Sequence, residues 1–170
     1  MKCDILLSGV GGQGVLSIAA IISQAAVNQG MYVRQSEVHG MAQRGGAVVA
    51  HLRLSDAPIA SDLIMKGSAD VLLSMEPLES LRYFEYLSAD GWLITASDGF
   101  YNIPDYPDIK KVLSEVKRHP NTRIIEAKKA AQEAGSPRSM NVVLVASASA
   151  VLPVRQDSLL KAIEQRFAGK

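Results

Sequence analysis

The chain has 170 residues, of which 48% are hydrophobic and 21% are charged, the balance of an ordinary globular protein. This length suits one domain with a buried core, so we expect residues 1–170 to form a single domain. The 18 basic and 17 acidic residues leave a net charge of +1, which argues against a nucleic-acid partner, because binding phosphates needs a basic excess. Cys3 is the only cysteine, which excludes an internal disulfide and a cysteine-held iron–sulfur cluster.

The amino-terminal quarter has the pattern of strand, glycine turn and helix. An apolar run from Lys2 to Ser8 predicts a buried strand, and the small and apolar residues 15–29 predict a covered helix. The turn between them reads Gly9-Val10-Gly11-Gly12-Gln13-Gly14. Glycine allows a left-handed turn and close approach of a ligand, and the start of a helix favours an anion. The pattern therefore predicts an anion-binding turn.

We expect the same segment to be a strand and a helix and not a targeting signal. Asp4 stands where a signal peptide carries positive charge, and glycines interrupt the apolar stretch, so we expect a cytoplasmic protein. No apolar run is long enough to span a bilayer, and we expect no membrane partner.

A second glycine loop follows closely. Residues 31–35 predict a strand, and a polar loop then reads Ser36-Glu37-Val38-His39-Gly40-Met41-Ala42-Gln43-Arg44-Gly45-Gly46. Only about ten residues lie before the next strand (47–54), too few for a helical crossover, so we expect that strand to break the parallel pattern. Arg44, followed by two glycines, offers a planar fork to an anion.

The remaining chain alternates strands and helices. A buried strand (69–74) leads into a helix that begins at Glu76-Pro77 and continues to Leu87. The turn Asp90-Gly91 precedes a strand (92–96), and the irregular stretch 97–108 follows. Further helices (109–118, 127–134, 141–152), a short strand (123–126) and a last helix to Phe167, capped by Asp157 or Ser158, complete the pattern. It predicts an α/β fold: a Rossmann-like three-layer α/β/α sandwich with a mostly parallel or mixed sheet.

We interpret Gly9–Gly14 and Gly40–Gly46 as two sides of one site or interface. The candidate cofactor-binding residues are Gly9, Gly11, Gly12, Gln13, Gly14, Gln43, Arg44, Gly45 and Gly46. Glu37 and His39 are the catalytic candidates, although a polar connection or a subunit contact explains His39 equally well. The three histidines show no metal-ligand spacing, so we predict no metal.

The turn also matches the dinucleotide-binding fingerprint, with glycines at the first, third and sixth places. Glu37, just past the second predicted strand, could then bind a ribose. A free-standing protein that binds NAD(P) or a flavin nucleotide is therefore one alternative. The short chain argues against it, because such enzymes usually carry a separate substrate domain.

Together the two glycine loops resemble the gamma-type subunit or domain of 2-oxoacid:ferredoxin oxidoreductases. The run from Ser36 to Gly46 is most similar to the small (beta) subunit of indolepyruvate ferredoxin oxidoreductase. The likeness covers nearly the whole chain, including Ser55–Ile59, Ala69-Asp70, Glu76-Pro77, Asn141 and Leu152-Pro153.

The resemblance implies a subunit that is inactive alone. Its complex would convert a 2-oxo acid, indolepyruvate or another arylpyruvate, to an acyl-CoA and pass electrons to ferredoxin. Thiamine diphosphate, Mg and the iron–sulfur clusters would lie on a large (alpha) subunit; here Asp90-Gly91 and Asp98-Gly99 lack the Gly-Asp-Gly start of a thiamine motif. Arg44 and the turn amides would bind CoA phosphates or the substrate carboxylate, with Glu37, His39 and Gln43 near the cofactor. A purely structural subunit whose glycine loops only contact the partner remains another alternative.

Overall fold

A computed structural model describes residues 1–39, 45–101 and 103–168. Six strands form one sheet in the order β2-β3-β1-β4-β5-β6. Their bounds are β1 (Lys2–Val10), β2 (Tyr32–His39), β3 (Ala47–Ser55), β4 (Ala69–Ser74), β5 (Leu87–Ala96) and β6 (Thr122–Ile125). The helices are α1 (Val15–Val27), α2 (Pro77–Arg82), α3 (Ile109–Val116), α4 (Ala127–Glu133), α5 (Met140–Ala148) and α6 (Gln156–Phe167), with a 3-10 turn at Phe84–Tyr86. None of these described helices has the length and apolar character needed to cross a membrane.

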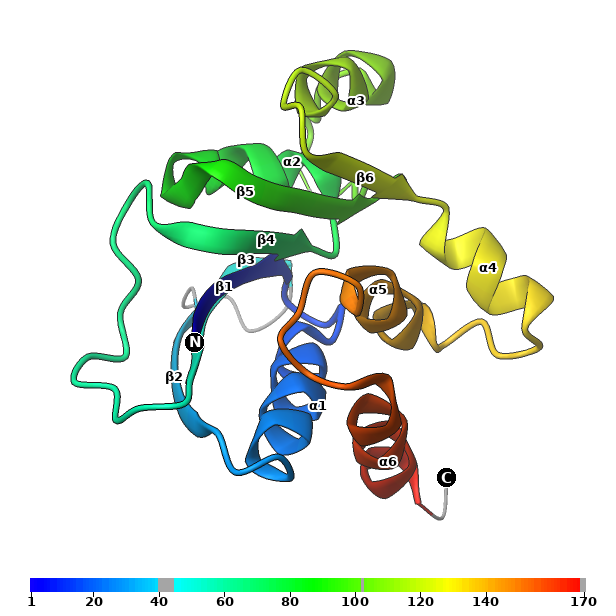
Figure 1. Cartoon of the computed structure of the whole chain (residues 1–170). Helices are drawn as coiled ribbons and strands as arrows, with labels where there is room; N and C mark the ends of the chain where they lie inside the picture. The colour runs from blue at the N-terminus through cyan, green and yellow to red at the C-terminus, as the bar shows by residue number, and fades with distance from the viewer. Residues whose placement is uncertain (40–44, 102, 169–170) are drawn as a thin grey trace.

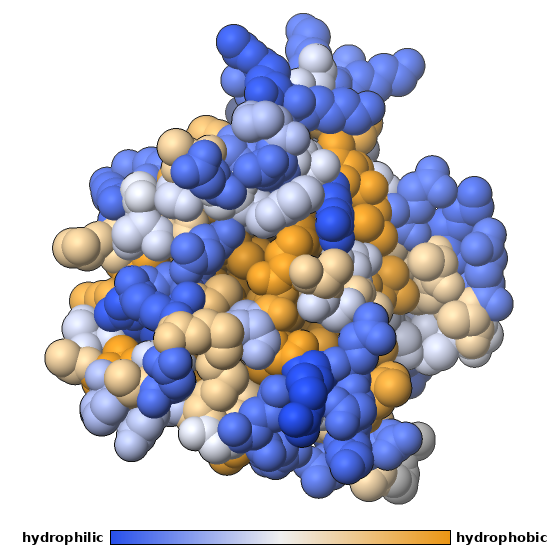
Figure 2. All heavy atoms as spheres, in the orientation of Figure 1, coloured by the Kyte–Doolittle hydropathy of each residue, from blue (hydrophilic) through white to orange (hydrophobic). Residues whose placement is uncertain are grey.

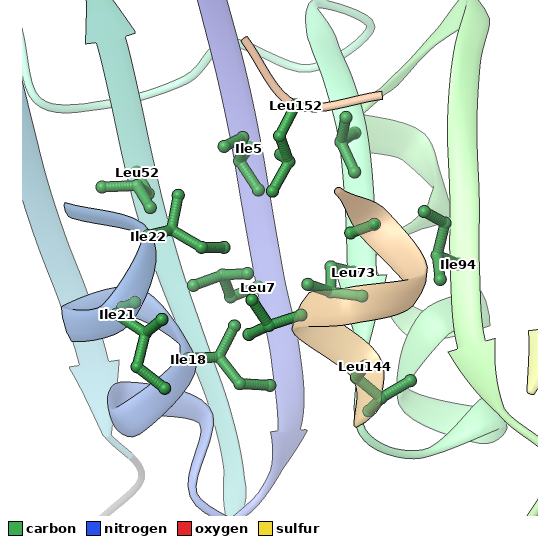
Figure 3. Packing of buried hydrophobic residues seen from close by; sticks show 14 of the residues in the cluster. Ile5, Leu7, Ile18, Ile21, Ile22, Leu52, Leu73, Ile94, Leu144 and Leu152 are labelled. Atoms are coloured by element: carbon green, nitrogen blue, oxygen red, sulfur yellow. The ribbon is translucent and has the colours of Figure 1, made fainter. Parts of the chain in front are cut away.

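Alternation along the buried strands creates the three layers. Successive side chains of a strand point to opposite faces, so Ile5 and Leu7 lie on one face of β1 and Leu6 lies on the other. The first face packs against α1 and α5, as the close view of Ile18, Ile22 and Leu144 shows (Figure 3), and α6 adds to the same core by packing on α1. The second face packs against α2 and α3 (Figure 1). The predicted α/β/α sandwich is therefore confirmed.

The sheet is mixed because of one strand. β1, β4, β5 and β6 run parallel, whereas β3 pairs antiparallel with both β1 and β2. The short connection before β3 predicted this break, and the prediction is confirmed. β3 thus separates β2 from β1, and its first residues lie beside the last residues of β1.

Several local predictions were wrong. The helix predicted from Glu76-Pro77 to Leu87 ends at Arg82, and Leu87 already begins β5. Residues 36–39 belong to β2 rather than to a loop, because an edge strand pairs on one side only and tolerates polar residues. Asp90 and Gly91 lie inside β5, where the pairing register with β4 shifts, and do not form a turn before it. The last helix begins at Gln156 after Arg155, so Asp157 lies in its first turn and neither predicted residue caps it.

The surface separates by polarity on the face turned to the viewer in Figure 2. Apolar residues gather there between the sheet and the helical layer of α1, α5 and α6, while charged residues occupy the margins. Some apolar side chains therefore reach the surface along this face of the molecule.

Candidate functional site

The two glycine segments lie side by side at the carboxyl end of β1. Gly11 N–H donates to the Gly46 carbonyl at 2.8 Å, and Gly45 N–H donates to the Gly11 carbonyl at 3.4 Å. These bonds continue the β1–β3 pairing, in which Val10 lies opposite Ala47. The predicted contact between the two segments therefore exists for Gly45 and Gly46. Because Gly11 N–H donates to the Gly46 carbonyl, that amide is not available to an anion.

The turn itself is held by Gln13. The Gln13 Oε1 atom accepts from Val10 N–H at 2.8 Å, and Gln13 N–H donates to the Val10 carbonyl at 3.0 Å. A Cβ on Gly9 would lie 2.8 Å from Val15 Cγ2 and 3.0 Å from Met75 Cβ. Gly9 and Gln13 therefore have a structural part in the turn, and their ligand-binding roles stay predictions.

Two helices begin next to each other at this turn. Gly14 has φ +91° and precedes the first residue of α1, and a Cβ there would lie 3.3 Å from Asn141 Nδ2 in the first turn of α5. Aligned peptide dipoles place partial positive charge at each helix start. On the α1 side the turn borders a cavity of about 280 Å³, lined by Val10, Gly11, Gly12, Gly14, Val15, Leu16, Ser17 and Val48. Both helix starts therefore favour negative charge near Gly12.

A larger cleft opens on the other side of Gly12. It has a volume of about 650 Å³ and lies where β1, β4 and β5 end, the usual binding position in an open α/β sheet. It is lined by Gly12, Gln13, Met75, Ser97, Asp98, Gly99, Phe100, Tyr101, Ile109, Lys128, Pro137, Arg138, Met140 and Asn141. Such a mixture of apolar side chains with a few polar groups is typical of small-molecule sites.

The cleft carries two basic side chains against one acidic one. Lys128 follows the start of α4, Arg138 precedes α5, and Asp98 follows β5. Lys128 and Arg138 are exposed and have no ion-pair partner among the described residues. Asp98 Oδ2 accepts from the Lys128 backbone N–H at 3.4 Å. The cleft can therefore bind a negatively charged group.

The sequence interpretation missed this part of the site. Lys128, Arg138 and Asn141 are not among the site residues that the sequence predicts. All three lie more than a hundred residues from Gly12, and they reach the turn because α5 packs against α1 and β5 while α4 packs against α5. The one available signal was Asn141 at the start of a small-residue helix.

The structure describes only some of the other predicted site residues. Glu37 is exposed on β2, where its Oε2 atom accepts from Gln35 Nε2 at 3.3 Å. The backbone of His39 pairs with Val48. Gln43 and Arg44 lie outside the described residues. The catalytic interpretation of Glu37 and His39 stays a prediction.

Comparison with known proteins identifies relatives along nearly the whole chain. Residues 4–170 match the family described as "Pyruvate ferredoxin/flavodoxin oxidoreductase". The Archaeoglobus fulgidus protein named "Indolepyruvate oxidoreductase subunit IorB" is 36% identical over 152 residues, which cover 85% of this chain and 75% of that protein.

Solved structures share the fold. The gamma subunit of keto/oxoacid ferredoxin oxidoreductase from Geobacter sulfurreducens is 25% identical, with a TM-score of 0.71 over 96% of this chain and 86% of that chain. The 2-oxoglutarate:ferredoxin oxidoreductase from Magnetococcus marinus gives a TM-score of 0.77 at 19% identity over 98% of this chain. The match spans only 27% of the latter chain, so this chain corresponds to about a quarter of it.

Proposed function

The chain belongs to the pyruvate ferredoxin/flavodoxin oxidoreductase family, and on this premise we propose that it is the small, gamma-type subunit of a thiamine-diphosphate-dependent 2-oxoacid ferredoxin oxidoreductase. The reaction is the oxidative decarboxylation of a 2-oxo acid to CO₂ and an acyl-CoA, with ferredoxin as electron acceptor. The relatives named as indolepyruvate oxidoreductase subunits support indolepyruvate or another arylpyruvate as the substrate. One observation carries the proposal: the hydrogen-bonded pair of glycine segments beside a basic cleft.

The redox centres belong to another polypeptide in this proposal. Cys3, the only cysteine, is buried in β1, so this chain has no thiolates with which to ligate a cluster. We therefore assign thiamine diphosphate, Mg and the iron–sulfur clusters to a large subunit. Residues 1–170 would form one gamma-type domain of that complex, in the cytoplasm.

This chain would contribute recognition of an anion. The candidate anions are the phosphates of CoA and the carboxylate of the 2-oxo acid. Arg138 and Lys128 would bind them from the cleft, the two helix starts at Gly14 and Asn141 would add favourable potential, and Arg44 would act from the second glycine segment. The Magnetococcus marinus structure, which contains coenzyme A, 2-oxoglutarate and succinyl-CoA, supports CoA as a ligand of such complexes.

The order of the strands argues against the dinucleotide alternative. In the dinucleotide fold the second strand pairs with the first, which brings its terminal acid to the ribose. Here β3 lies between β1 and β2, so Glu37 is one strand further from the glycine turn, about 10 Å from β1 at the usual strand spacing. Tight binding of NAD(H), NADP(H) or a flavin by the isolated chain in calorimetry would nevertheless favour this alternative.

Reconstitution tests the proposal. The purified chain mixed with its large subunit should restore dye reduction that depends on both CoA and indolepyruvate, and neither chain alone should be active. Failure to form a complex would overturn the proposal. Arg44→Ala should raise the KM for CoA or for the 2-oxo acid, and normal kinetics after conservative changes in both glycine segments would favour a purely structural subunit.

A further inference from the structure

Glu76 is a buried carboxylate at the carboxyl end of β4, directly behind the cleft. It is 1% exposed, and no lysine or arginine pairs with it in the part of the chain that the structure describes. Burying a carboxylate without a cation is costly unless hydrogen bonds compensate for the lost water. The neighbouring cleft residue Met75 separates Glu76 from β4, and Glu76 itself does not line the cleft.

The two carboxylate oxygens of Glu76 serve different parts of the chain. Oε2 accepts from Glu79 N–H at 2.7 Å and so caps α2. Oε1 accepts from Phe100 N–H at 3.3 Å and from the Tyr106 hydroxyl. Capping a six-residue helix needs one oxygen, which a serine or threonine supplies equally well. The second oxygen is therefore used to fix the segment that follows β5.

That segment forms one wall of the cleft. We call Gly99, Phe100 and Tyr101 the aromatic wall; all three line the cleft, and Tyr101 is 69% exposed. The rings of Tyr101 and Tyr106 lie 4.7 Å apart, and a Cβ on Gly99 would lie 2.9 Å from the Tyr106 hydroxyl. Burial, followed by the hydrogen bond to Glu76, raises the pKa of Tyr106, so the hydroxyl stays protonated and donates.

We propose that Glu76 and Tyr106 are positioning residues, which hold the aromatic wall against the cleft and thereby set its affinity for the anionic ligand without touching that ligand. The inference rests on the proposed function of the cleft. It follows from the sharing of one buried carboxylate oxygen between Phe100 N–H, which belongs to the aromatic wall, and the Tyr106 hydroxyl, whose ring lies beside that wall. Loss of either bond would let the wall move away from Lys128 and Arg138.

Removal of single hydroxyl groups in the reconstituted complex tests this inference. Tyr106→Phe should raise the KM for CoA or for indolepyruvate about fivefold, the effect of one lost hydrogen bond, with kcat unchanged. The matched control is Tyr86→Phe, because Tyr86 packs beside His51 and Tyr83 on the α2 side and does not line the cleft. Its kinetic constants should equal those of the wild type.

Two further variants separate positioning from folding. Glu76→Gln leaves a single uncharged acceptor oxygen for the donors of Glu79, Phe100 and Tyr106, so it should raise the same KM. The double variant Glu76→Gln/Tyr106→Phe should raise it by less than the product of the two single fold-changes, because both changes act on the same bond between Oε1 and the hydroxyl group. Gly99→Ala pushes a methyl group against the Tyr106 hydroxyl and should give the same KM change while both bonding groups remain.

The outcomes are distinct. Unchanged KM values for both ligands in Tyr106→Phe and Gly99→Ala, or a fall in kcat alone, would overturn the positioning role. A wild-type complex that forms but shows no reaction dependent on CoA and indolepyruvate would overturn the proposed function instead.

Discussion

Two arginines at opposite ends of the same sheet have very different surroundings. Near the amino end of β1, Arg53 Nε and Nη2 donate to the two carboxylate oxygens of the buried Asp4 at 2.8 and 3.1 Å, and Nη1 donates to the carbonyls of Ser61 and Leu63. At the carboxyl end of the parallel strands, Arg138 is exposed in the cleft, with no ion-pair partner among the described residues. The first end holds its arginine in a buried ion pair, whereas the second leaves its arginine exposed and, among the described residues, without an ion-pair partner.

The largest expected effect is on stability and concerns Arg53, the arginine in the buried ion pair. Arg53→Ala should lower the free energy of unfolding by about 3 kcal/mol or more, because it leaves the Asp4 carboxylate buried with only Lys2 beside it. Denaturant unfolding of the wild-type protein and of the variant measures this difference in the free energy of unfolding. Arg118→Ala is the control: its pair with Glu115 is exposed, and its loss should cost less than about 0.5 kcal/mol. Equal losses would contradict the contrast between buried and exposed pairs.

The glycine turn sharpens the comparison between the two ends of the sheet. It lies beside the cleft at the carboxyl end of the parallel strands and yet is tightly packed. Gly9→Ala should destabilise the fold by about 2 kcal/mol, since the new methyl group meets Val15 and Met75. Gly12→Ala meets no atom within 4 Å, but φ is +100°, so we expect about 1 kcal/mol from backbone strain. Thermal or denaturant unfolding of each variant measures the loss of stability from the packing clash at Gly9 and from the backbone strain at Gly12. A larger loss for Gly12→Ala than for Gly9→Ala would show that packing is not the main constraint on this turn.

The exposed arginine should matter for binding and not for folding. Arg138→Ala and Lys128→Ala should each raise the KM for CoA or for the 2-oxo acid about tenfold, which corresponds to about 1.4 kcal/mol, while the unfolding midpoint stays unchanged. Lys129→Ala is the matched control, because Lys129 pairs with Glu126 at 3.3 Å outside the cleft. If the Lys129 variant loses as much affinity as the Lys128 variant, the cleft does not select the anion.

The smallest effect is a pH dependence beside Arg53. Burial, and then the charge of Arg53, lower the pKa of His51 below its ordinary value of 6.5, and Nδ1 accepts from Ile64 N–H at 3.1 Å. A lowered folded-state pKa means that the unfolded chain binds this proton first, so stability is full above pH 6.5 and falls as the pH drops below it. The contribution is less than about 1.4 kcal/mol per pH unit. His51→Asn keeps an acceptor near Ile64 and should flatten this part of the curve of unfolding free energy against pH; an unchanged curve would exclude His51 as its source.

Hydrophobic patterns were sufficient to predict most of the fold. Strands such as β4 are continuous apolar runs, and the short connection before β3 determined its direction. Local patterns failed where the sheet decides the structure. Polar residues Ser36 and Glu37 extend the edge strand β2 through pairing with β3. The Asp90-Gly91 turn signal lies in β5 at the shift of its pairing register with β4, and the strand continues through it to pair again from Trp92 onward.

The site could be predicted only in part. The glycine turn is local, so strand, turn and helix follow directly from the order of residues. Its contact with Gly45 and Gly46 was expected from the two glycine segments, but it depends on the β1–β3 register, which the sequence did not predict. The cleft depends on packing over long distances along the chain: Arg138 and Asn141 reach Gly12 only because α5 packs against α1 and β5.

The antiparallel strand has a consequence for the order in which the molecule can assemble during synthesis. Every hydrogen bond between the two glycine segments lies within the first 46 residues, so this pairing becomes available once β3 has left the ribosome. The pocket next to it needs residues up to Asn141. A nascent chain stopped before α5 would therefore carry the glycine pair without its pocket, so the cleft is completed only when the carboxyl-terminal helices have been synthesised.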